Sequence, residues 1–193
     1  MTGRRHSRKA PRKITPQSLE NAAAAYLQRF AASAETLRRV LLRRVRRSAA
    51  AHGTDPEAAT AMVAALIERY RRVGLIDDRA FAEGRAARLH RRGLPISRIR
   101  RHLAEKGVAA PDIDGALAAL AEADTGPSLS ADARAAFNLA RRRRLGPFRP
   151  AADRALHRDR DLAALARAGF AYALARRLID AETPDAFVAE TAI

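Results

Sequence analysis

The 193-residue chain contains no cysteine, which excludes disulfide bonds and thiolate metal sites. It also lacks a run of about 18 apolar residues, the length that a membrane-spanning helix requires. The basic start, MTGRRHSRKAPRK, is not followed by the apolar segment of a secretion signal. We therefore expect a cytoplasmic protein without a membrane partner.

Motifs for catalysis are lacking as well. None of the five histidines belongs to an HExxH pair, and the chain has neither a phosphate-binding glycine loop nor a GxSxG elbow. Asp77 and Asp78 are adjacent and could bind a metal, but a helix N-terminus also favours acidic residues through its free N–H groups and its dipole. We expect this second role, with no metal, no cofactor and no enzymatic activity.

Acidic residues are scarce in the first part of the chain. Residues 1–53 contain 13 Lys and Arg against 2 Asp and Glu, whereas residues 54–124 contain 12 against 11 and residues 125–193 contain 12 against 8. Most of the net charge of +16 therefore lies before residue 54, which predicts a polyanionic partner. Aromatic residues make up only 5% of the chain, too few to form a base-stacking platform among the basic clusters. Contacts with phosphates or carboxylates are favoured instead.

Arginines form clusters on the predicted helices. In the helix expected from about Ala34 to Ala51, four arginines share the face opposite an apolar stripe, and Glu35 is the only acid. A run of four arginines precedes Gly146, where one or two cations would be enough to complement a helix dipole. A solvated helix face is the alternative for each cluster, but such faces normally mix acids and bases. The candidate binding residues are Arg39, Arg43, Arg46, Arg47, Arg91, Arg92, Arg141, Arg142, Arg143 and Arg144.

Helical periodicity extends along the chain after residue 15, and no segment alternates apolar and polar residues as a strand would. Six glycines follow helical runs, at places where a left-handed C-terminal cap requires a residue without a side chain. Ser97 is expected to cap a short helix. The sequence therefore predicts an all-α protein of about nine helices. The six glycines are Gly53, Gly74, Gly93, Gly107, Gly146 and Gly169.

Two internal matches indicate repeats. Ala-aromatic pairs that end at Tyr26, Phe81 and Phe137 lie 55 and then 56 residues apart, and each is expected early in a helix. A second pattern occurs twice, as Leu103, Gly107, Ile113 and Leu117 and again as Leu165, Gly169, Leu174 and Leu178. Repeated helical units are the simplest explanation.

The predicted organisation is a series of three similar units. A disordered basic arm at 1–15 precedes three-helix repeats at 16–76, 77–124 and 125–182, and a tail follows at 183–193. Residues 145–161 are expected to form a long connector, which would make the third unit irregular. Because each unit is too small to bury its own helix faces, neighbours should stack into an elongated and curved chain. We expect this chain to be a monomer.

Three stretches carry a resemblance to a known family: AYLQRFAASAETLRRVLLRR at 25–44, GLIDDRAFAEGRAARLHRRGLPISRIRRHLAEKGV at 74–108, and LARAGFAYALARRLI at 165–179. In these stretches the chain resembles the RecX family, regulators of the bacterial RecA recombinase. The resemblance implies tandem three-helix repeats that bind along the RecA filament and reduce its strand exchange and ATP hydrolysis. It also implies affinity for single- or double-stranded DNA without sequence specificity.

A DNA-binding module that acts in transcription is the alternative interpretation. Residues 78–92 and 95–106 could form a helix-turn-helix pair of the kind found in repressors. Three similar units argue against it, because a repressor does not require them, and no dimerisation helix is evident. A scaffold associated with RNA or the ribosome is supported by charge alone.

Overall fold

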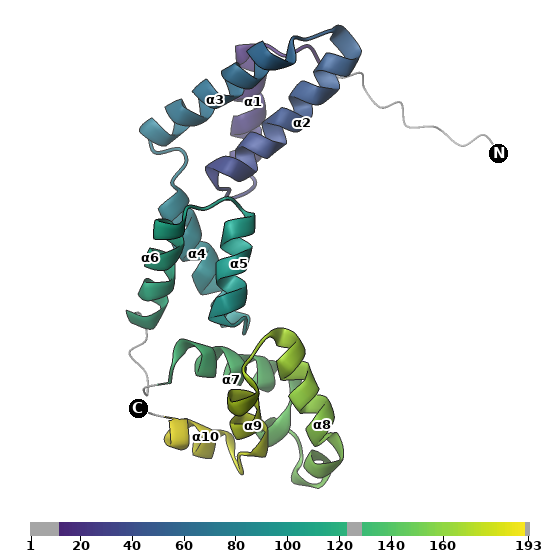
Figure 1. Ribbon diagram of the computed structural model, residues 1–193, viewed down its shortest axis with the longest axis vertical. Coiled ribbons are helices and arrows are strands. Elements are labelled where there is room, and N and C mark those ends of the chain that lie inside the picture. Colours follow the sequence, from purple (N-terminus) through teal and green to yellow (C-terminus); the bar gives the residue numbers. More distant parts are fainter. Residues whose placement is uncertain (1–11, 123–128, 192–193) are drawn as a thin grey trace, which may run out of the picture. The chain divides into compact units, whose positions relative to one another are not determined.

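The structure is a computed structural model, which describes residues 12–122 and 129–191. Those residues form ten α-helices and one 3₁₀-helix and contain no strand (Figure 1), so the prediction of an all-α chain is confirmed. The chain divides into two compact units, Met1–Asp78 and Arg79–Ile193, and each is described by itself. Residues 1–11 of the expected arm lie outside the described residues, as does the expected boundary between residues 124 and 125.

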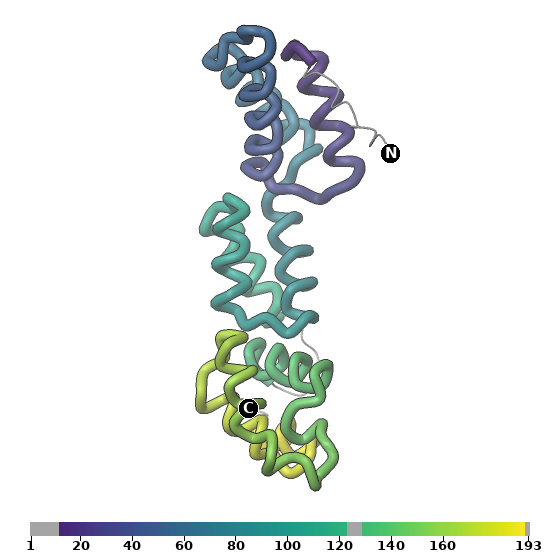
Figure 2. The backbone as a smooth tube through the Cα atoms, turned by 90° about the vertical axis from the view of Figure 1, so that its right-hand side faces the viewer, coloured from purple at the N-terminus to yellow at the C-terminus, as the bar shows by residue number. Residues whose placement is uncertain are grey.

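The first unit contains α1 (Pro16–Leu27), α2 (Ala34–His52) and α3 (Pro56–Arg72). Within this unit α1 and α3 both lie beside α2 (Figures 1 and 2). The apolar stripes of the three helices meet in one buried cluster, as amphipathic helices of this kind require. Its most deeply buried large members are Leu19, Leu37, Leu41, Val45 and Val63.

Local sequence signals set the ends of these helices. The Thr15 hydroxyl accepts a hydrogen bond from the Ser18 N–H at 3.1 Å, and the Ser18 hydroxyl accepts one from the Thr15 N–H at 2.9 Å, so the pair forms a capping box. Ser33 caps α2 by accepting the N–H of Thr36 at 3.1 Å. The cap residue at the other end of α2 is Gly53, whose φ of +61° lies in the left-handed region predicted for it.

The residues just before α1 are held against α2. The N–H of Ile14 donates to the Ser48 hydroxyl at 3.1 Å, and the Ile14 side chain packs on the core of the first unit. Ser48 is fully buried and also shares a 2.7 Å hydrogen bond with the Thr54 hydroxyl. The last residues of the expected arm are therefore part of the packed unit.

The second unit begins at the second residue of α4 (Asp78–Arg91) and continues with α5 (Ile96–Glu105) and α6 (Ala110–Glu122). The cap predicted at Ser97 is wrong, because α5 already begins at Ile96. Pro95 occupies the cap position and makes no side-chain hydrogen bond there. A side chain from another helix caps α5 instead, since Asp132 Oδ1 accepts the N–H of Ile96 at 2.8 Å. The buried apolar cluster of these three helices includes Ala82, Leu89, Ile99, Leu103 and Ile113.

The rest of the second unit contains α7 (Ala131–Arg143), the 3₁₀-helix η1 (Gly146–Phe148), α8 (Ala151–Ala168), α9 (Tyr172–Asp180) and α10 (Pro184–Thr191). The expected long connector is wrong, because its larger part, residues 151–161, belongs to α8. The residue before α8 is Pro150, which makes no side-chain cap, so the usual signal of a helix start is missing.

The segment expected as a tail contains α10, whose Phe187 side chain is fully buried. The Phe187 ring stacks on the ring of Phe137 in α7 with the centroids 6.2 Å apart. Phe187 therefore attaches this end of the chain to the third apolar cluster, which also includes Leu139, Leu165 and Leu178.

The structure tests both internal sequence matches. The second is confirmed, since Leu103 and Leu165 are fully buried near the ends of α5 and α8, and the glycines that follow both have positive φ. The first is wrong about position in the helix for two of its three aromatic residues, because Tyr26 lies in the last turn of α1 and Phe137 in the middle of α7, and only Phe81 lies early in its helix. The buried apolar residues of the described chain form three clusters, within 19–76, 82–117 and 133–187. Each lies within one expected repeat, except that the third also includes Phe187.

Candidate nucleic-acid interface

A concave surface of about 340 Å³ in the second unit brings five arginines together. Three of them, Arg92, Arg142 and Arg143, are candidates predicted from the sequence, whereas Arg98 and Arg167 were missed. The five belong to the ends of α4, α7 and α8 and to the start of α5. The other lining residues are small or aliphatic: Gly93, Leu94, Leu139, Ala164 and Ala168. We call this surface the arginine hollow.

Gly93 holds the turn between α4 and α5 directly against α7. Its φ is +75°, and a Cβ atom built on it would lie 2.8 Å from the Leu139 Cβ and 2.9 Å from the Ala135 carbonyl oxygen. Only glycine combines a left-handed backbone with so close an approach. The sequence predicts Gly93 as a helix end, and the structure adds that Gly93 places Arg92 beside the last turn of α7.

Two hydrogen bonds fix the same contact between helices. The Asp132 carboxylate of α7 accepts the N–H of Ile96, the first residue of α5, at 2.8 Å. The Nε2 of His90 lies 2.7 Å from the Ala131 carbonyl oxygen and donates to it, and this histidine is only 7% exposed. His90 therefore has a structural role, since it attaches the end of α4 to the first residue of α7.

Arg98 is positioned by the end of α8. Its Nη2 donates to the Arg167 carbonyl oxygen at 2.7 Å, one of the carbonyls that a helix leaves without a partner at its C-terminus. Gly169, with φ +98°, gives the space, because a Cβ there would lie 3.1 Å from the Arg98 Nε. Arg98 is in the first turn of α5, where the helix dipole disfavours a cation. That unfavourable position is the sequence signal by which Arg98 could have been found.

The arginine hollow has more positive charge than its surroundings balance. The last turns of α7 and α8, the residues directly after α4 and the first turn of α5 contribute to its lining. Each helix C-terminus is equivalent to about half a negative charge, and a helix N-terminus to about half a positive charge. Together the three C-termini and the one N-terminus offset about one of the five positive charges, and no Asp or Glu lines the hollow. Within the described part of the chain, the guanidinium groups of Arg92, Arg142, Arg143 and Arg167 form no ion pair. Such a surface can bind phosphate or carboxylate groups through charge-assisted hydrogen bonds.

A second basic surface lies on α2 in the first unit. Arg39, Arg43, Arg46 and Arg47 are exposed on the side of α2 opposite its buried residues. They extend over nine residues of the helix, or about 12 Å along its axis. We call this surface the α2 face.

Glu35 partly neutralises the first turn of the α2 face. It accepts hydrogen bonds from the Nε atoms of Arg38 and Arg39 at 2.6 and 2.7 Å. The hydrogen bond from Arg38 is the main reason that the pKa of Glu35 is lowered, although burial acts in the opposite direction. In the described residues Arg43, Arg46 and Arg47 form no ion pair, so the positive charge of the α2 face is concentrated toward the C-terminal half of the helix.

The remaining predicted site residues lie outside the arginine hollow. Arg91, Arg141 and Arg144 are exposed but do not line it. Arg144 ends α7 in the left-handed conformation, with φ 54° and ψ 55°. Its N–H donates to the Ala140 and Arg141 carbonyls, so the backbone of Arg144 closes the helix in the way that glycine commonly does.

Asp78 is used in helix packing. Its Oδ1 accepts the N–H of Ala34 at the start of α2 at 2.8 Å, and its Oδ2 accepts from the Arg71 Nη2 at 2.8 Å. Among the residues that the structure describes, no group of three or more metal-binding side chains could hold a metal ion. Nor does this part of the chain contain a helix that is long and apolar enough to cross a bilayer.

Comparison with known proteins gives two matches. Residues 77–117, which span α4, α5 and most of α6, match the family model described as RecX, second three-helix domain. Over 173 residues the chain is 44% identical to Regulatory protein RecX of Myxococcus xanthus (strain DK1622), and the alignment covers 89% of each chain. No solved structure matches this chain significantly.

Proposed function

This chain belongs to the RecX family of regulatory proteins, and on that basis we propose that it regulates RecA-mediated homologous recombination and DNA repair. It binds the RecA filament on DNA and lowers the rates at which that filament hydrolyses ATP and exchanges strands. The observation that carries the proposal is the 44% identity with a RecX regulatory protein over 89% of both chains. The RecX match therefore extends well beyond one repeat.

The arginine hollow and the α2 face are the surfaces that this function would use. A RecA filament on DNA presents phosphates and the carboxylates of a protein surface, and arginine binds both through two parallel N–H donors. The arginine hollow supports this role because it has five arginines and no acidic lining residue. The α2 face supports it because three of its four arginines are exposed without an ion pair within the described residues.

Contacts of this kind give affinity for DNA without reading its sequence. Phosphate groups are the same at every position of a strand, so arginines that bind them set position and strength but not specificity. We therefore expect that the affinity for DNA, whether single- or double-stranded, is similar for unrelated sequences at a given salt concentration.

The proposal is tested by strand exchange. RecA from the same organism is assembled on circular single-stranded DNA, and exchange with a homologous linear duplex is followed with increasing amounts of this protein. Substoichiometric amounts relative to RecA should slow the appearance of product, because such amounts are too small to mask the DNA. Unchanged exchange at an equimolar ratio, with folded protein at low salt, overturns the proposal.

A repressor is separated from a RecA regulator by the DNA that each prefers. Binding to a pool of genomic duplex fragments is compared with binding to random duplexes at the same salt concentration. A repressor binds its operator about 10³-fold or more tightly than other DNA. Equal binding to both pools supports the RecA regulator, whereas enrichment of one fragment favours the repressor.

A further inference from the structure

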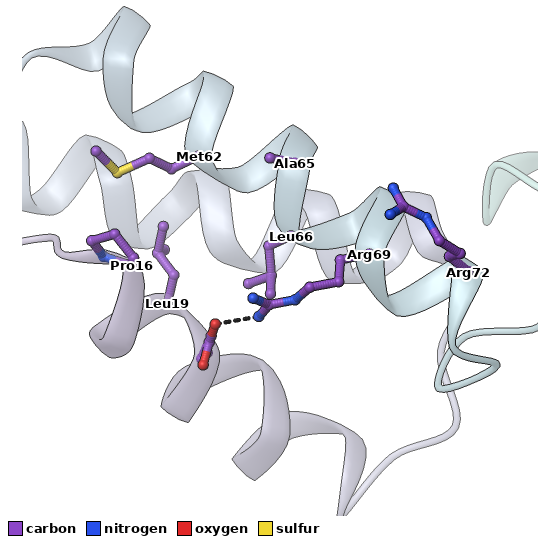
Figure 3. A pocket seen from close by; sticks show the side chains of 8 residues that line it. Pro16, Leu19, Met62, Ala65, Leu66, Arg69 and Arg72 are labelled. Carbon is purple, nitrogen blue, oxygen red and sulfur yellow. Dashed lines mark hydrogen bonds and ion pairs between the residues drawn. The ribbon is translucent and has the colours of Figure 1, made fainter.

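An apolar groove of about 400 Å³ lies between α1 and α3 in the first unit (Figure 3). Its floor includes Leu19 of α1 and Leu66 of α3, which are 1% and 6% exposed. On α3, Met62 and Ala65 form its edge one turn apart, and the small Ala65 side chain leaves the space open. Met62 is 39% exposed, so its side chain is accessible to a partner at the edge of the groove.

One end of this groove is positively charged. Arg69 and Arg72 continue the line of Met62 and Ala65 along α3 (Figure 3). The only acidic residue in the lining, Glu20, is bound to Arg69. Arg72 is exposed and, among the residues described, forms no ion pair. The groove thus offers apolar contact along its length and an uncompensated cation at its end.

The composition of the groove matches that of protein interfaces. Methionine and arginine are enriched at interfaces, and methionine adapts its shape to a partner because it is flexible and polarisable. A volume of about 400 Å³ can receive one or two apolar side chains, as when a helix or short segment lies in a hydrophobic groove. The unpaired Arg72 adds a requirement for an acidic group on the partner.

Two other occupants fit the groove less well. Residues 1–11 precede α1, but they contain Arg4, Arg5, Arg8 and Lys9 and no acid, so the cationic end of the groove would repel them. A second copy of the chain has an acidic and apolar sequence at residues 182–193. However, Phe187, its largest apolar side chain, is fully buried in the core of its own unit.

We propose that the groove between α1 and α3 binds a short segment of the RecA protein that combines an apolar side chain with a carboxylate. This contact is a protein contact, separate from the arginine hollow and the α2 face. It rests on the proposed function for the identity of the partner. Its role is to give the protein affinity for RecA itself, beyond affinity for the DNA in the filament.

Cross-linking from the groove tests the proposal directly. The chain has no cysteine, so Met62→Cys provides a single attachment point for a thiol-reactive benzophenone. Leu156→Cys is the control, because Leu156 is an apolar residue in α8 that is 82% exposed. On RecA filaments, the label at residue 62 should form at least about five times more cross-links to RecA than the label at residue 156, at a RecA segment that contains Asp or Glu. Equal yields, cross-links to residues 1–11, or cross-linked pairs of this chain formed without RecA overturn the proposal.

A matched pair of substitutions gives a second readout. Ala65→Glu narrows the groove and neutralises its cationic end, whereas Ala64→Glu adds the same charge at an exposed neighbouring position that does not line the groove. Ala65→Glu should weaken binding to RecA filaments about tenfold and leave binding to free DNA within about twofold of Ala64→Glu. Equal affinities of the two variants for the filament overturn the inference, while the wild-type effect on RecA strand exchange still supports the proposed function. A wild-type protein that does not bind the filament overturns both.

Discussion

Asp161 is the most deeply buried charged residue among those that the structure describes, with a side chain only 2% exposed. Its Oδ2 accepts from the Arg149 Nε at 2.7 Å and from the Gly146 N–H at 2.9 Å, and its Oδ1 accepts from the Arg149 Nη2 at 2.8 Å. Burial raises the pKa of Asp161, but the hydrogen bonds from Arg149 and Gly146 outweigh it, and the pKa is lowered. The ion pair attaches the 3₁₀-helix η1 to α8.

We predict that Asp161→Ala lowers the free energy of unfolding by about 2–3 kcal/mol, because it leaves the Gly146 N–H and the Arg149 guanidinium without their acceptor. Arg149 is 22% exposed and can reach water, which keeps the cost below the roughly 3–5 kcal/mol that is typical of a broken buried ion pair. Asp159→Ala is the control: its side chain is 97% exposed, so it should cost less than about 0.5 kcal/mol. Urea unfolding of both variants measures the difference, and equal costs would refute the role given to Asp161.

The effect of Asp161 should depend on pH. A carboxylate whose pKa is lowered by folding contributes stability above its ordinary pKa of 3.8 and loses that contribution as the pH falls through the folded value. The difference between wild type and Asp161→Ala should therefore be complete at neutral pH and shrink below about pH 3.8. A difference that stays constant down to about pH 2.5 would show that the charge of Asp161 does not contribute.

At the scale of single residues, charge patterns identify candidate binding residues but do not show which of them lie together. The arginine runs could be recognised from charge alone, and Arg92, Arg142 and Arg143 indeed line one surface. Arg98 and Arg167 could not be recognised in this way, because neither belongs to a run. Their place in the arginine hollow follows from contacts between helices that are far apart in sequence, such as the hydrogen bond from Arg98 to the Arg167 carbonyl.

At the scale of elements, helix ends were predictable where the signal is local. Five of the six glycines expected as left-handed caps follow helix ends with positive φ: Gly53, Gly74, Gly93, Gly107 and Gly169, because a helix C-terminus commonly requires that conformation. The cap predicted at Gly146 is wrong, because Arg144 closes α7 and Gly146 begins η1. The starts of α5 and α8 were not predictable, since the first is capped by Asp132 of α7 and the second has no side-chain cap. The helix in the expected tail was also missed, because what places it in the core is the burial of Phe187 against distant helices.

The glycines differ in what surrounds them, which leads to a prediction for Gly93. Gly93→Ala should lower the free energy of unfolding by about 2–4 kcal/mol, because the new side chain requires a left-handed backbone and also overlaps with α7. Gly53→Ala also has positive φ but nothing within 4 Å of its Cβ, so it should cost only about 1 kcal/mol. Gly84 lies inside α4, and a side chain there would have open space around it. Gly84→Ala should therefore raise the free energy of unfolding by about 0.5–1 kcal/mol.

Thermal and urea unfolding of the three variants check this order. Gly93→Ala should also weaken binding to single-stranded DNA, because the displaced turn carries Arg92 away from α7. Similar costs for Gly93→Ala and Gly53→Ala would contradict the close packing of the turn on α7. If a folded Gly93→Ala variant binds DNA normally, the packing of this turn on α7 is not required for DNA binding.

At the scale of the whole molecule, the repeats and the all-helical class followed from sequence periodicity, since burial of one helix face imposes it. The arrangement of the repeats does not follow from periodicity, and the elongated, curved chain stays a prediction. The net charge of +16 predicts the class of partner but not the surface that binds it. The arginine hollow depends on three helix ends that no sequence pattern places together.

Binding through the arginine hollow should depend strongly on salt. Arg142→Ala with Arg143→Ala should flatten the log–log salt dependence of single-stranded DNA binding by about 1.4, or about 0.7 for each lost phosphate contact. The control is Arg88→Ala with Arg160→Ala, which removes the same charge at exposed positions of the same unit outside the hollow. If Arg142 and Arg143 act only as helix-end cations, the variant should lose at most about 1 kcal/mol for each residue and keep the salt dependence of the control.

The most direct test of the proposed function is the ATPase of RecA on single-stranded DNA, measured with increasing amounts of this protein. If the protein regulates RecA by binding its filament, hydrolysis should fall at substoichiometric amounts, and the variant with Arg142→Ala and Arg143→Ala should require about ten times more protein for the same effect. A rate of hydrolysis that is unchanged at an equimolar ratio, with folded wild-type protein at low salt, would contradict the proposed function.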